Sequence, residues 1–202
     1  MSNKRKIGLL GGSFNPAHEG HLYISKIALT ALGLDEVWWL VSPQNPLKSG
    51  AETAGYETRL HNAQKLIKDH RIKVSDFEQK VGQTYTAKTL QALKRCYPDI
   101  TFVWLMGADN LQQIPKWHQW HSIFKSCPIA VFDRPGYTYQ ALNGKAAHRY
   151  RHCRKYAASW GRPTPNFANQ STPSWIFVTH TKHKLSSSYI RKTATNAGKA
   201  CS

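Results

Sequence analysis

The chain has 202 residues and a mass of 22.9 kDa, which suits one domain with a small appended part and is short for two full domains. Apolar residues make up 41% of it and it carries seven Trp, which excludes a chain that is disordered throughout. The formal net charge is +17, and twelve Lys and Arg residues but no acid follow Asp133. This excess indicates a polyanionic partner, such as nucleic acid, an anionic membrane or a phosphorylated small molecule, or else a solvated basic surface.

Short apolar runs alternate with amphipathic segments along the chain. Strands are expected at residues 7–10, 37–41, 72–74, 100–106, 128–132 and 175–179, and helices at 20–32, 56–67, 86–97, 146–157 and 187–195. Continuously apolar strands alternating with helices predict an α/β fold, a Rossmann-like doubly wound parallel sheet with helices on both faces. We expect residues 1–202 to form a single domain with a small C-terminal helical part, in which residues 137–174 are a basic helix-and-loop insertion before the last strand.

The sequence gives little support for a membrane span, a signal peptide or a metal site. No run approaches the ~20 apolar residues of a transmembrane helix, and residues 7–10 are too short for a signal peptide core. The four cysteines form no C-x-x-C pair, so we expect neither a disulfide framework nor structural zinc, and a cytoplasmic location. His148 and His152 have helical spacing but no further ligand nearby, which favours a solvated basic face over a metal site.

The segment after the first expected strand has the parts of a phosphate cradle. In parallel sheets, ligands bind beyond the carboxyl ends of the strands. Gly11 and Gly12 let the backbone approach an anion, and Ser13 adds a hydroxyl. The next helix would aim its free N–H groups at the same point, with His18 and His21 around its start. A glycine turn with two surface histidines is the alternative, but the convergence of these features favours an anion site.

A second candidate anion site follows the last expected strand. Ser186, Ser187 and Ser188 are good N-caps for the closing helix. Arg191 falls three residues after Ser188, on the same side one turn later. Taken alone, this segment is equally compatible with an ordinary capped helix that carries a solvated arginine.

The two segments together resemble the nucleotidyltransferase superfamily with the H-x-G-H and S-S-x-x-x-R signatures, and within it the bacterial-type nicotinate-nucleotide adenylyltransferases. The resemblance extends from residue 7 to residue 191 and includes the run Gly-Gly-Ser-Phe-Asn-Pro. It departs from the family at Ala17, where many members have a second proline. It implies an ATP site formed by Gly11, Gly12, Ser13, Phe14, His18, His21, Ser187, Ser188 and Arg191.

The resemblance also implies a site for the pyridine ring of nicotinate mononucleotide. Thr86, together with Tyr85, would receive the nicotinate carboxylate, although Thr86 could also cap its own helix. Trp117 would stack on the pyridine ring, since a flat aromatic face suits that contact. For Trp120 we expect a place in the core instead.

By the same resemblance, residues that follow other strands would contact the ribose and phosphate of the mononucleotide. Gly107 and Asp109 would contact them, although Asp109 could instead cap the next short helix, and Arg134 would complete the site. Lys48 would orient the mononucleotide phosphate. Many members have His before this lysine where this chain has Leu47, which weakens the match there.

The implied reaction joins ATP and nicotinate mononucleotide to give deamido-NAD (nicotinate adenine dinucleotide) and pyrophosphate, a step of NAD biosynthesis. The mononucleotide phosphate attacks the α-phosphorus in line, with no covalent enzyme intermediate, so catalysis is positioning plus charge stabilisation. His18, His21, Lys48 and Arg191 are the expected catalytic residues. Mg²⁺ would accompany ATP and have few direct protein ligands.

Two alternatives remain at this stage. The first is an adenylyltransferase that acts on nicotinamide mononucleotide or phosphopantetheine; the chain length, Thr86 and Trp117 argue against the phosphopantetheine branch. The second is a nucleic-acid-binding module that uses the basic last third, which would bind DNA or RNA in a salt-sensitive way but leaves the two anion sites unexplained. We therefore expect neither a nucleic acid nor a membrane as the partner, and the oligomeric state stays open.

Overall fold

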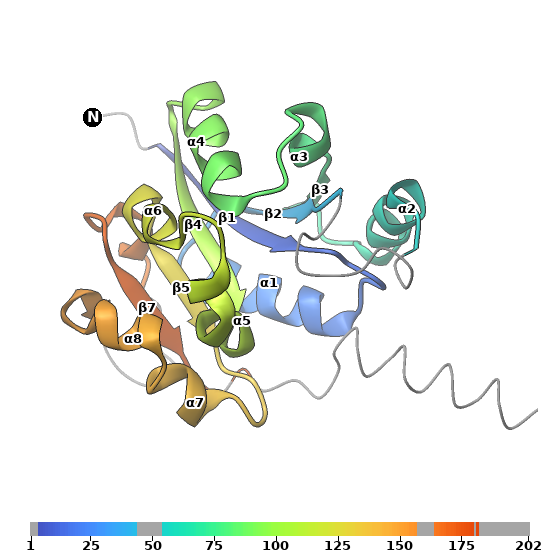
Figure 1. The fold of residues 1–202 in the computed structure, drawn as a ribbon. Coiled ribbons are helices and arrows are strands. Elements are labelled where there is room, and N and C mark those ends of the chain that lie inside the picture. The colour runs from blue at the N-terminus through green and yellow to red at the C-terminus, as the bar shows by residue number, and fades with distance from the viewer. Residues whose placement is uncertain (1–3, 44–53, 157–163, 180, 182–202) are drawn as a thin grey trace, which may run out of the picture.

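The computed structural model describes residues 4–43, 54–156, 164–179 and 181. Seven strands in this part of the chain form one sheet in the order β3-β2-β1-β4-β5-β7-β6, and every pair of neighbours is parallel (Figure 1). The strands are β1 (Arg5–Gly12), β2 (Glu36–Val41), β3 (Ile72–Ser75), β4 (Ile100–Gly107), β5 (Ile129–Phe132), β6 (Arg154–Lys155) and β7 (Trp175–Val178). The predicted parallel α/β fold is confirmed, while the closing helix predicted over residues 187–195 lies outside the described residues.

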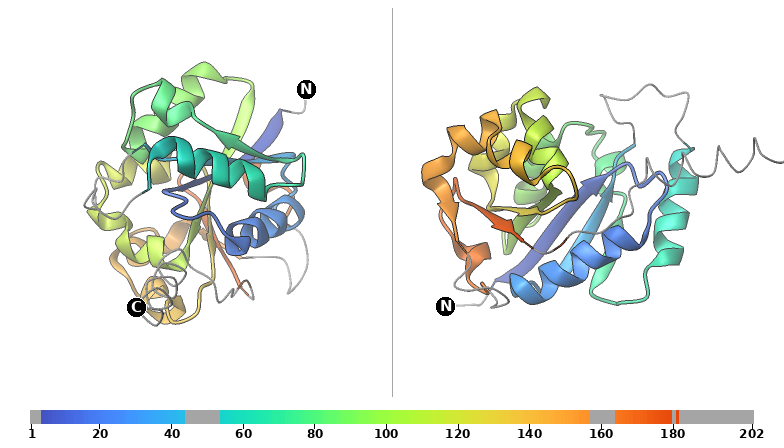
Figure 2. Two further views of the ribbon diagram at one scale, coloured as in Figure 1. Left: turned by 90° about the vertical axis from the view of Figure 1, so that its right-hand side faces the viewer. Right: turned by 90° about the horizontal axis from the view of Figure 1, so that it is seen from below.

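Helices cover both faces of the sheet, as Figure 2 shows when the molecule is seen from below. One face packs against α1 (Glu19–Ala31), α2 (Tyr56–Leu66) and the short turn η4 (Phe167–Asn169). The other face packs against α3 (Phe77–Lys80), α4 (Thr86–Cys96), α5 (Ala108–Gln113), η2 (Ile114–Lys116), α6 (Trp120–Ser126), α7 (Thr138–Leu142) and α8 (Lys145–Arg149). Among the described residues, no helix is long and apolar enough to span a membrane.

Burial on both faces explains the continuously apolar strands. All four residues of β5 are buried, and in β4 every residue from Phe102 to Gly107 is buried. Alternate side chains of these strands enter the two separate core clusters, one on each face of the sheet. The sheet therefore forms the middle layer of three, and its carboxyl edge is where loops can gather polar groups.

The helix that the sequence predicts over residues 146–157 ends early. In the structure α8 stops at Arg149, a 3₁₀ turn η3 (Arg151–Cys153) follows, and β6 then adds a parallel edge strand beside β7. Tyr150 accounts for the break. Its ring stacks on Phe124 with centroids 4.0 Å apart, and its carbonyl accepts a hydrogen bond from Trp175 Nε1 at 2.8 Å. These tertiary contacts outweigh the helical spacing of the apolar residues.

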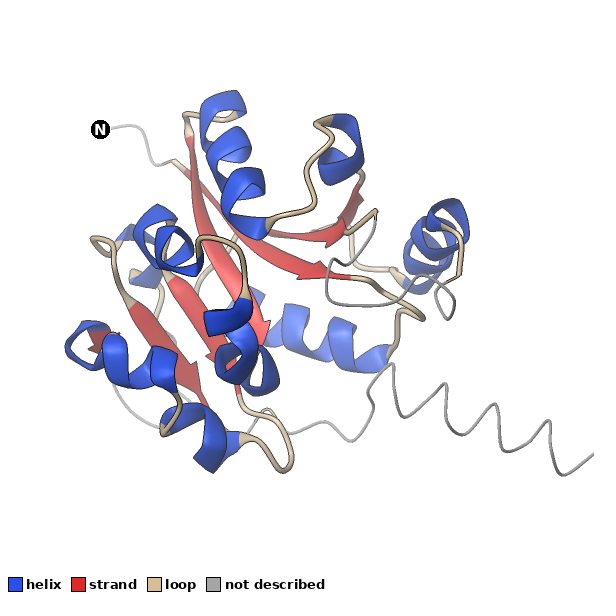
Figure 3. Ribbon diagram, viewed as in Figure 1, coloured by secondary structure: helices blue, strands red, loops and turns tan. Residues whose placement is uncertain are grey.

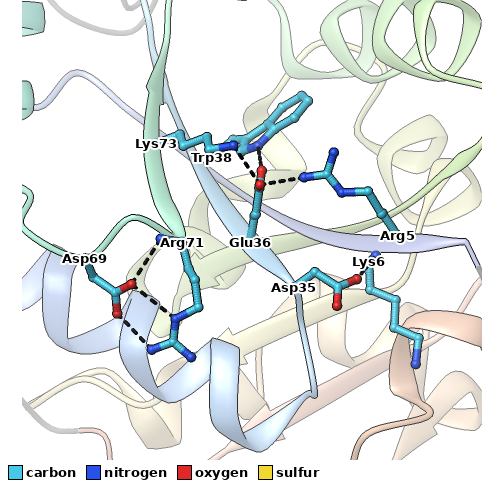
Figure 4. Close-up of polar contacts among 8 residues, drawn as sticks. All are labelled: Arg5, Lys6, Asp35, Glu36, Trp38, Asp69, Arg71 and Lys73. Carbon is cyan, nitrogen blue, oxygen red and sulfur yellow. Dashed lines mark hydrogen bonds and ion pairs between the residues drawn. The ribbon is translucent and has the colours of Figure 1, made fainter.

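Ion pairs connect the amino ends of β1, β2 and β3 (Figure 4). The Glu36 carboxylate pairs with Arg5, and it accepts hydrogen bonds from Lys73 Nζ at 2.6 Å and Trp38 Nε1 at 2.8 Å. Burial by itself raises the pKa of Glu36, but the hydrogen bonds from Lys73 and Trp38 outweigh it and hold that pKa below its ordinary value. The ion pairs of Glu36 with Arg5 and Lys73 therefore link these three strands at the molecular surface.

The chain changes direction across the sheet between β1 and β4. From β1 it runs through β2 to β3 on one side, and from β4 it runs through β5 toward β7 on the other. Because β1 and β4 are parallel neighbours in the twisted sheet (Figure 3), the loops that follow them leave the sheet side by side. Ligands of open parallel sheets bind at such a switch point, beyond the carboxyl ends of the strands.

Candidate active site

The loop between β1 and α1, residues 13–18, is called the anion loop below. Packing against the core requires glycine where β1 leads into this loop. A Cβ at Gly11 would overlap the ring of Trp104, whereas a Cβ at Gly12 would make only ordinary contacts. Phe14 turns the chain with a φ of 47°, and its buried ring stacks on Trp39 with centroids 5.0 Å apart. Only the main chain of Phe14 therefore remains to contact a ligand, and Gly11 serves the core as well as the loop.

His18 and His21 cap the start of α1 reciprocally. Nδ1 of His18 accepts the Gly20 N–H at 3.1 Å, and Nδ1 of His21 accepts the His18 N–H at 3.2 Å. In a neutral imidazole whose Nδ1 accepts, the proton lies on Nε2. The two rings, with centroids 3.9 Å apart, thus each carry an Nε2–H donor. The sequence identified both histidines, but not the mutual capping that fixes which nitrogen donates.

His21 is held in its neutral form. Burial is the largest cause of a pKa well below the ordinary value, and the nearby His18 and Arg134 lower it further, against a smaller opposing effect of the hydrogen bond from the His18 main chain. The ring lies among Phe14, His18 and Trp39. At the start of α1, His21 can therefore donate a hydrogen bond from Nε2 to an anion without being protonated.

Gly107, Asp109 and Arg134 meet at the carboxyl ends of β4 and β5. Arg134 Nη1 donates to Asp109 Oδ2 at 2.6 Å, and both side chains are mostly buried. Asp109 Oδ1 is buried and has no hydrogen-bond partner among the described residues, so it can accept from a ligand hydroxyl. A Cβ at Gly107 would overlap Asp109 Oδ1, so only glycine leaves room for this carboxylate. The N-cap position of α5 belongs to Gly107, so Asp109 lies inside the first turn of that helix.

Tyr85, Thr86 and Trp117 lie on the side of the molecule formed by α4 and the segment after η2. The N-cap position of α4 belongs to Tyr85, and no side-chain cap hydrogen bond is present there, so Thr86 is the first helical residue rather than the cap. The Tyr85 ring contacts the ring of His118, with centroids 4.5 Å apart, a pair that the sequence did not reveal. Trp117 is half-buried against the core cluster, and Trp120 is buried, in keeping with its expected place in the core.

Sequence reasoning also missed two buried charged residues near the anion loop. Arg59 of α2 is 2% exposed and Glu78 of α3 is 5% exposed. For Arg59 a signal existed, because it lies four residues before Ala63 on the apolar face of the predicted helix. Glu78 falls in a stretch without periodicity, and nothing in the sequence marks it.

Four of the expected site residues lie outside the described residues: Lys48, Ser187, Ser188 and Arg191. Among the residues that the structure does describe, no three His, Cys, Asp or Glu side chains are grouped so that they could hold a metal ion. The structure brings His18, His21 and Arg134 together at the switch point between β1 and β4. Arg134 lies close enough to His21 to lower its pKa.

The chain is similar in sequence and in fold to known proteins. A family model described as cytidylyltransferase-like matches residues 9–193. A probable nicotinate-nucleotide adenylyltransferase of Parvibaculum lavamentivorans is 58% identical over 146 residues, which cover 72% of this chain and 73% of that protein. One of Agrobacterium fabrum is 42% identical over 185 residues, which cover 92% and 97%. In fold, the chain is similar to a Plasmodium falciparum nicotinic acid mononucleotide adenylyltransferase complexed with NaAD, with a TM-score of 0.66, 18% identity and coverage of 93% and 83%.

Proposed function

The chain belongs to the cytidylyltransferase-like family, and from this premise we propose that it transfers the adenylyl group of ATP to nicotinate mononucleotide. The products are nicotinate adenine dinucleotide and pyrophosphate. Relatives with this activity in their names cover almost the whole chain, and residues 9–193 match one family model. We propose on the same grounds that residues 1–202 act as one nucleotidyltransferase domain, in which β6 extends the sheet from within residues 137–174.

The observation that carries the proposal is the histidine pair at the start of α1. Two imidazoles whose Nε2–H donors are fixed by mutual capping, at the positive end of the α1 dipole, suit the phosphate oxygens of ATP. As the α-phosphorus accepts the new P–O bond, negative charge develops on the oxygens around it and on the departing pyrophosphate. His18 and His21 stabilise that charge as donors that are already in place.

The remaining polar residues of the site serve the second substrate. Asp109 Oδ1 accepts a ribose hydroxyl, while Arg134, held by Asp109 Oδ2, brings positive charge toward the reacting phosphates. Trp117 stacks on the pyridine ring, and Thr86 with the neighbouring main chain receives the nicotinate carboxylate. The attacking phosphate is already ionised, so the reaction needs no protein nucleophile.

Residues outside the described part of the chain complete the proposal through the family resemblance. Lys48 would orient the mononucleotide phosphate, and Ser187, Ser188 and Arg191 would hold the departing pyrophosphate. By the same resemblance, Mg²⁺ would accompany ATP and have few direct protein ligands. We assign no protein ligand to the ion.

A pyrophosphate-release assay with ATP and three acceptors tests the proposal. Nicotinate mononucleotide, nicotinamide mononucleotide and phosphopantetheine are supplied in turn at equal concentration. We expect kcat/KM to be highest for nicotinate mononucleotide. A higher kcat/KM for either of the other acceptors, or no release with any of the three, would refute the assignment.

A further inference from the structure

Arg59 of α2 is buried beside the anion loop, where the described residues give it no carboxylate partner. Within the described part of the chain, its guanidinium donates to main-chain carbonyls. Nη1 donates to Ser13 O at 2.7 Å and to Ser42 O at 2.8 Å, Nη2 to Pro43 O at 2.9 Å, and Nε to Ala54 O at 2.9 Å. One planar group thus holds carbonyls from three separate places in the chain.

These places all belong to the edge of the sheet where the site lies. Ser13 opens the anion loop directly after β1, and Ser42 and Pro43 follow β2. Ala54 precedes α2, and its N–H donates to the Asn15 side chain of the anion loop at 3.4 Å. The Ser42 N–H in turn donates to Gly12 O at 3.0 Å. Arg59 therefore connects the anion loop to the segments on either side of residues 44–53.

The geometry needs an arginine. The fixed fork of the guanidinium directs several N–H groups in one plane, whereas a lysine ammonium is a compact point charge with three donors. A buried cation is tolerated only when its donors are satisfied, and among the described residues carbonyl dipoles rather than an acid satisfy them. Burial lowers the pKa of the Arg59 guanidinium from its ordinary high value, and nearby Tyr56 opposes this effect.

Ser42, one of the residues that Arg59 holds, is fixed from a second side. Its hydroxyl donates a hydrogen bond to the buried Glu78 carboxylate, which also accepts from Thr89 Oγ1 at 3.0 Å. Thr89 lies in α4, one turn after Thr86. The carbonyl of Ser42 is thus bound to Arg59 and its side chain to Glu78, so the anchor for the anion loop is itself attached to α4.

We propose that Arg59 is a positioning residue for adenylyl transfer, which acts by holding the anion loop at Ser13 against the segment after β2. This inference rests on the proposed function. Arg59 contacts no reacting group. Its effect passes through the main chain to the loop that leads to His18 and His21, where a displacement of about 1 Å costs on the order of 100-fold in rate.

The test compares Arg59→Lys with Arg71→Lys, a conservative change at an exposed arginine that pairs with Asp69. We measure kcat, both KM values, and the Kd of a non-hydrolysable ATP analogue by calorimetry. For Arg59→Lys we expect the Kd of the analogue and the KM of ATP to rise about tenfold and kcat to fall about 10- to 100-fold, with the KM of nicotinate mononucleotide within about twofold of wild type. Arg71→Lys should match wild type in all four quantities.

A purely structural role predicts something else. It would lower kcat through loss of folded enzyme and leave both KM values and the analogue Kd unchanged, and this result would overturn the proposal. If Arg59→Lys does not fold, Arg59→Gln is measured in the same way, and failure of both variants to fold would assign Arg59 a structural role only. The analogue Kd needs no acceptor substrate, so it still tests Arg59 if wild-type enzyme fails to use nicotinate mononucleotide.

Discussion

At the amino ends of β1, β2 and β3, Glu36 pairs with Arg5 and Lys73, whose side chains are 55% and 52% exposed. At the carboxyl ends of β1 and β2, Arg59 is almost completely buried, and its partners among the described residues are main-chain carbonyls. The two edges of one sheet thus hold charge in different ways. The amino edge places ion pairs in contact with water, whereas at the carboxyl ends of β1 and β2 backbone dipoles surround the Arg59 cation.

The difference decides where an anion can be stabilised. Exposed ion pairs are screened by solvent and salt, and they contribute little to stability. Donors that are buried and already oriented interact more strongly with a developing charge, because little solvent or side-chain rearrangement is needed. The mutually capped histidines and the Asp109–Arg134 pair belong to this second kind. We therefore expect substitutions at the carboxyl edge to change catalysis and those at the amino edge to change only stability.

The largest effect is expected for His21→Ala. The change removes an Nε2–H donor at the ATP phosphates, so kcat/KM should fall by about 100- to 1000-fold, as for loss of one preorganised donor. The His18 N–H also loses its acceptor, at a cost of about 1 kcal/mol in the free energy of unfolding. Steady-state kinetics and thermal unfolding measure the two effects.

A matched variant separates those effects. His21→Asn offers a side-chain oxygen to the His18 N–H but no donor at the position of Nε2. It should lose nearly as much activity as His21→Ala while keeping more stability. Wild-type turnover in a folded His21→Ala protein would contradict the proposed role of the histidine.

A smaller effect is expected for Gly107→Ala. The added Cβ overlaps Asp109 Oδ1, so the carboxylate must move and the pair with Arg134 is disturbed. We expect kcat/KM to fall by about 10- to 100-fold. Gly55→Ala is the control, because the only atom near its added Cβ is Thr58 Oγ1 at 3.9 Å. Equal activity of the two variants would show that the position of Asp109 is unimportant.

A pH-dependent effect on stability is expected for Glu78→Gln. Burial is the main cause that raises the pKa of Glu78 to about 7, against the hydrogen bonds from Thr89 and Ser42. Because the folded protein binds this proton more tightly than the unfolded chain does, the contribution of Glu78 to stability is present below pH 4.5 and is lost as pH rises through 7. Relative to wild type, Glu78→Gln should gain roughly 1–3 kcal/mol between pH 5 and pH 8. Denaturant unfolding at both pH values measures this, and a difference that does not vary with pH would contradict it.

The smallest effect is expected for Glu36→Gln at the amino edge. Here the folded-state pKa is lowered, so the contribution of Glu36 is present above pH 4.5 and is lost as pH falls through the folded pKa, opposite in sign to Glu78. We expect a loss of less than about 1 kcal/mol at pH 7 that shrinks with added salt, and an unchanged kcat/KM. A clear fall in kcat/KM would mean that the two edges are not functionally separate.

Six of the seven strands and the loop with the two histidines could be predicted from the sequence, because continuous burial produces continuous apolar runs and loops after parallel strands carry the polar residues. β6 could not, since Tyr150 ends the preceding helix through contacts with Phe124 and Trp175 that are distant in sequence. Arg59 was missed for a related reason. Its partners are backbone carbonyls, which every residue possesses, so only the folded arrangement shows that they converge.

Mapping of amide chemical shifts with a non-hydrolysable ATP analogue tests most directly whether the carboxyl edge is the working edge of the sheet. The account predicts the largest changes at the anion loop, at His21 and at the amides that follow Gly107, with none at Arg5, Glu36 or Lys73. Changes centred on Arg5, Glu36 and Lys73 would contradict it.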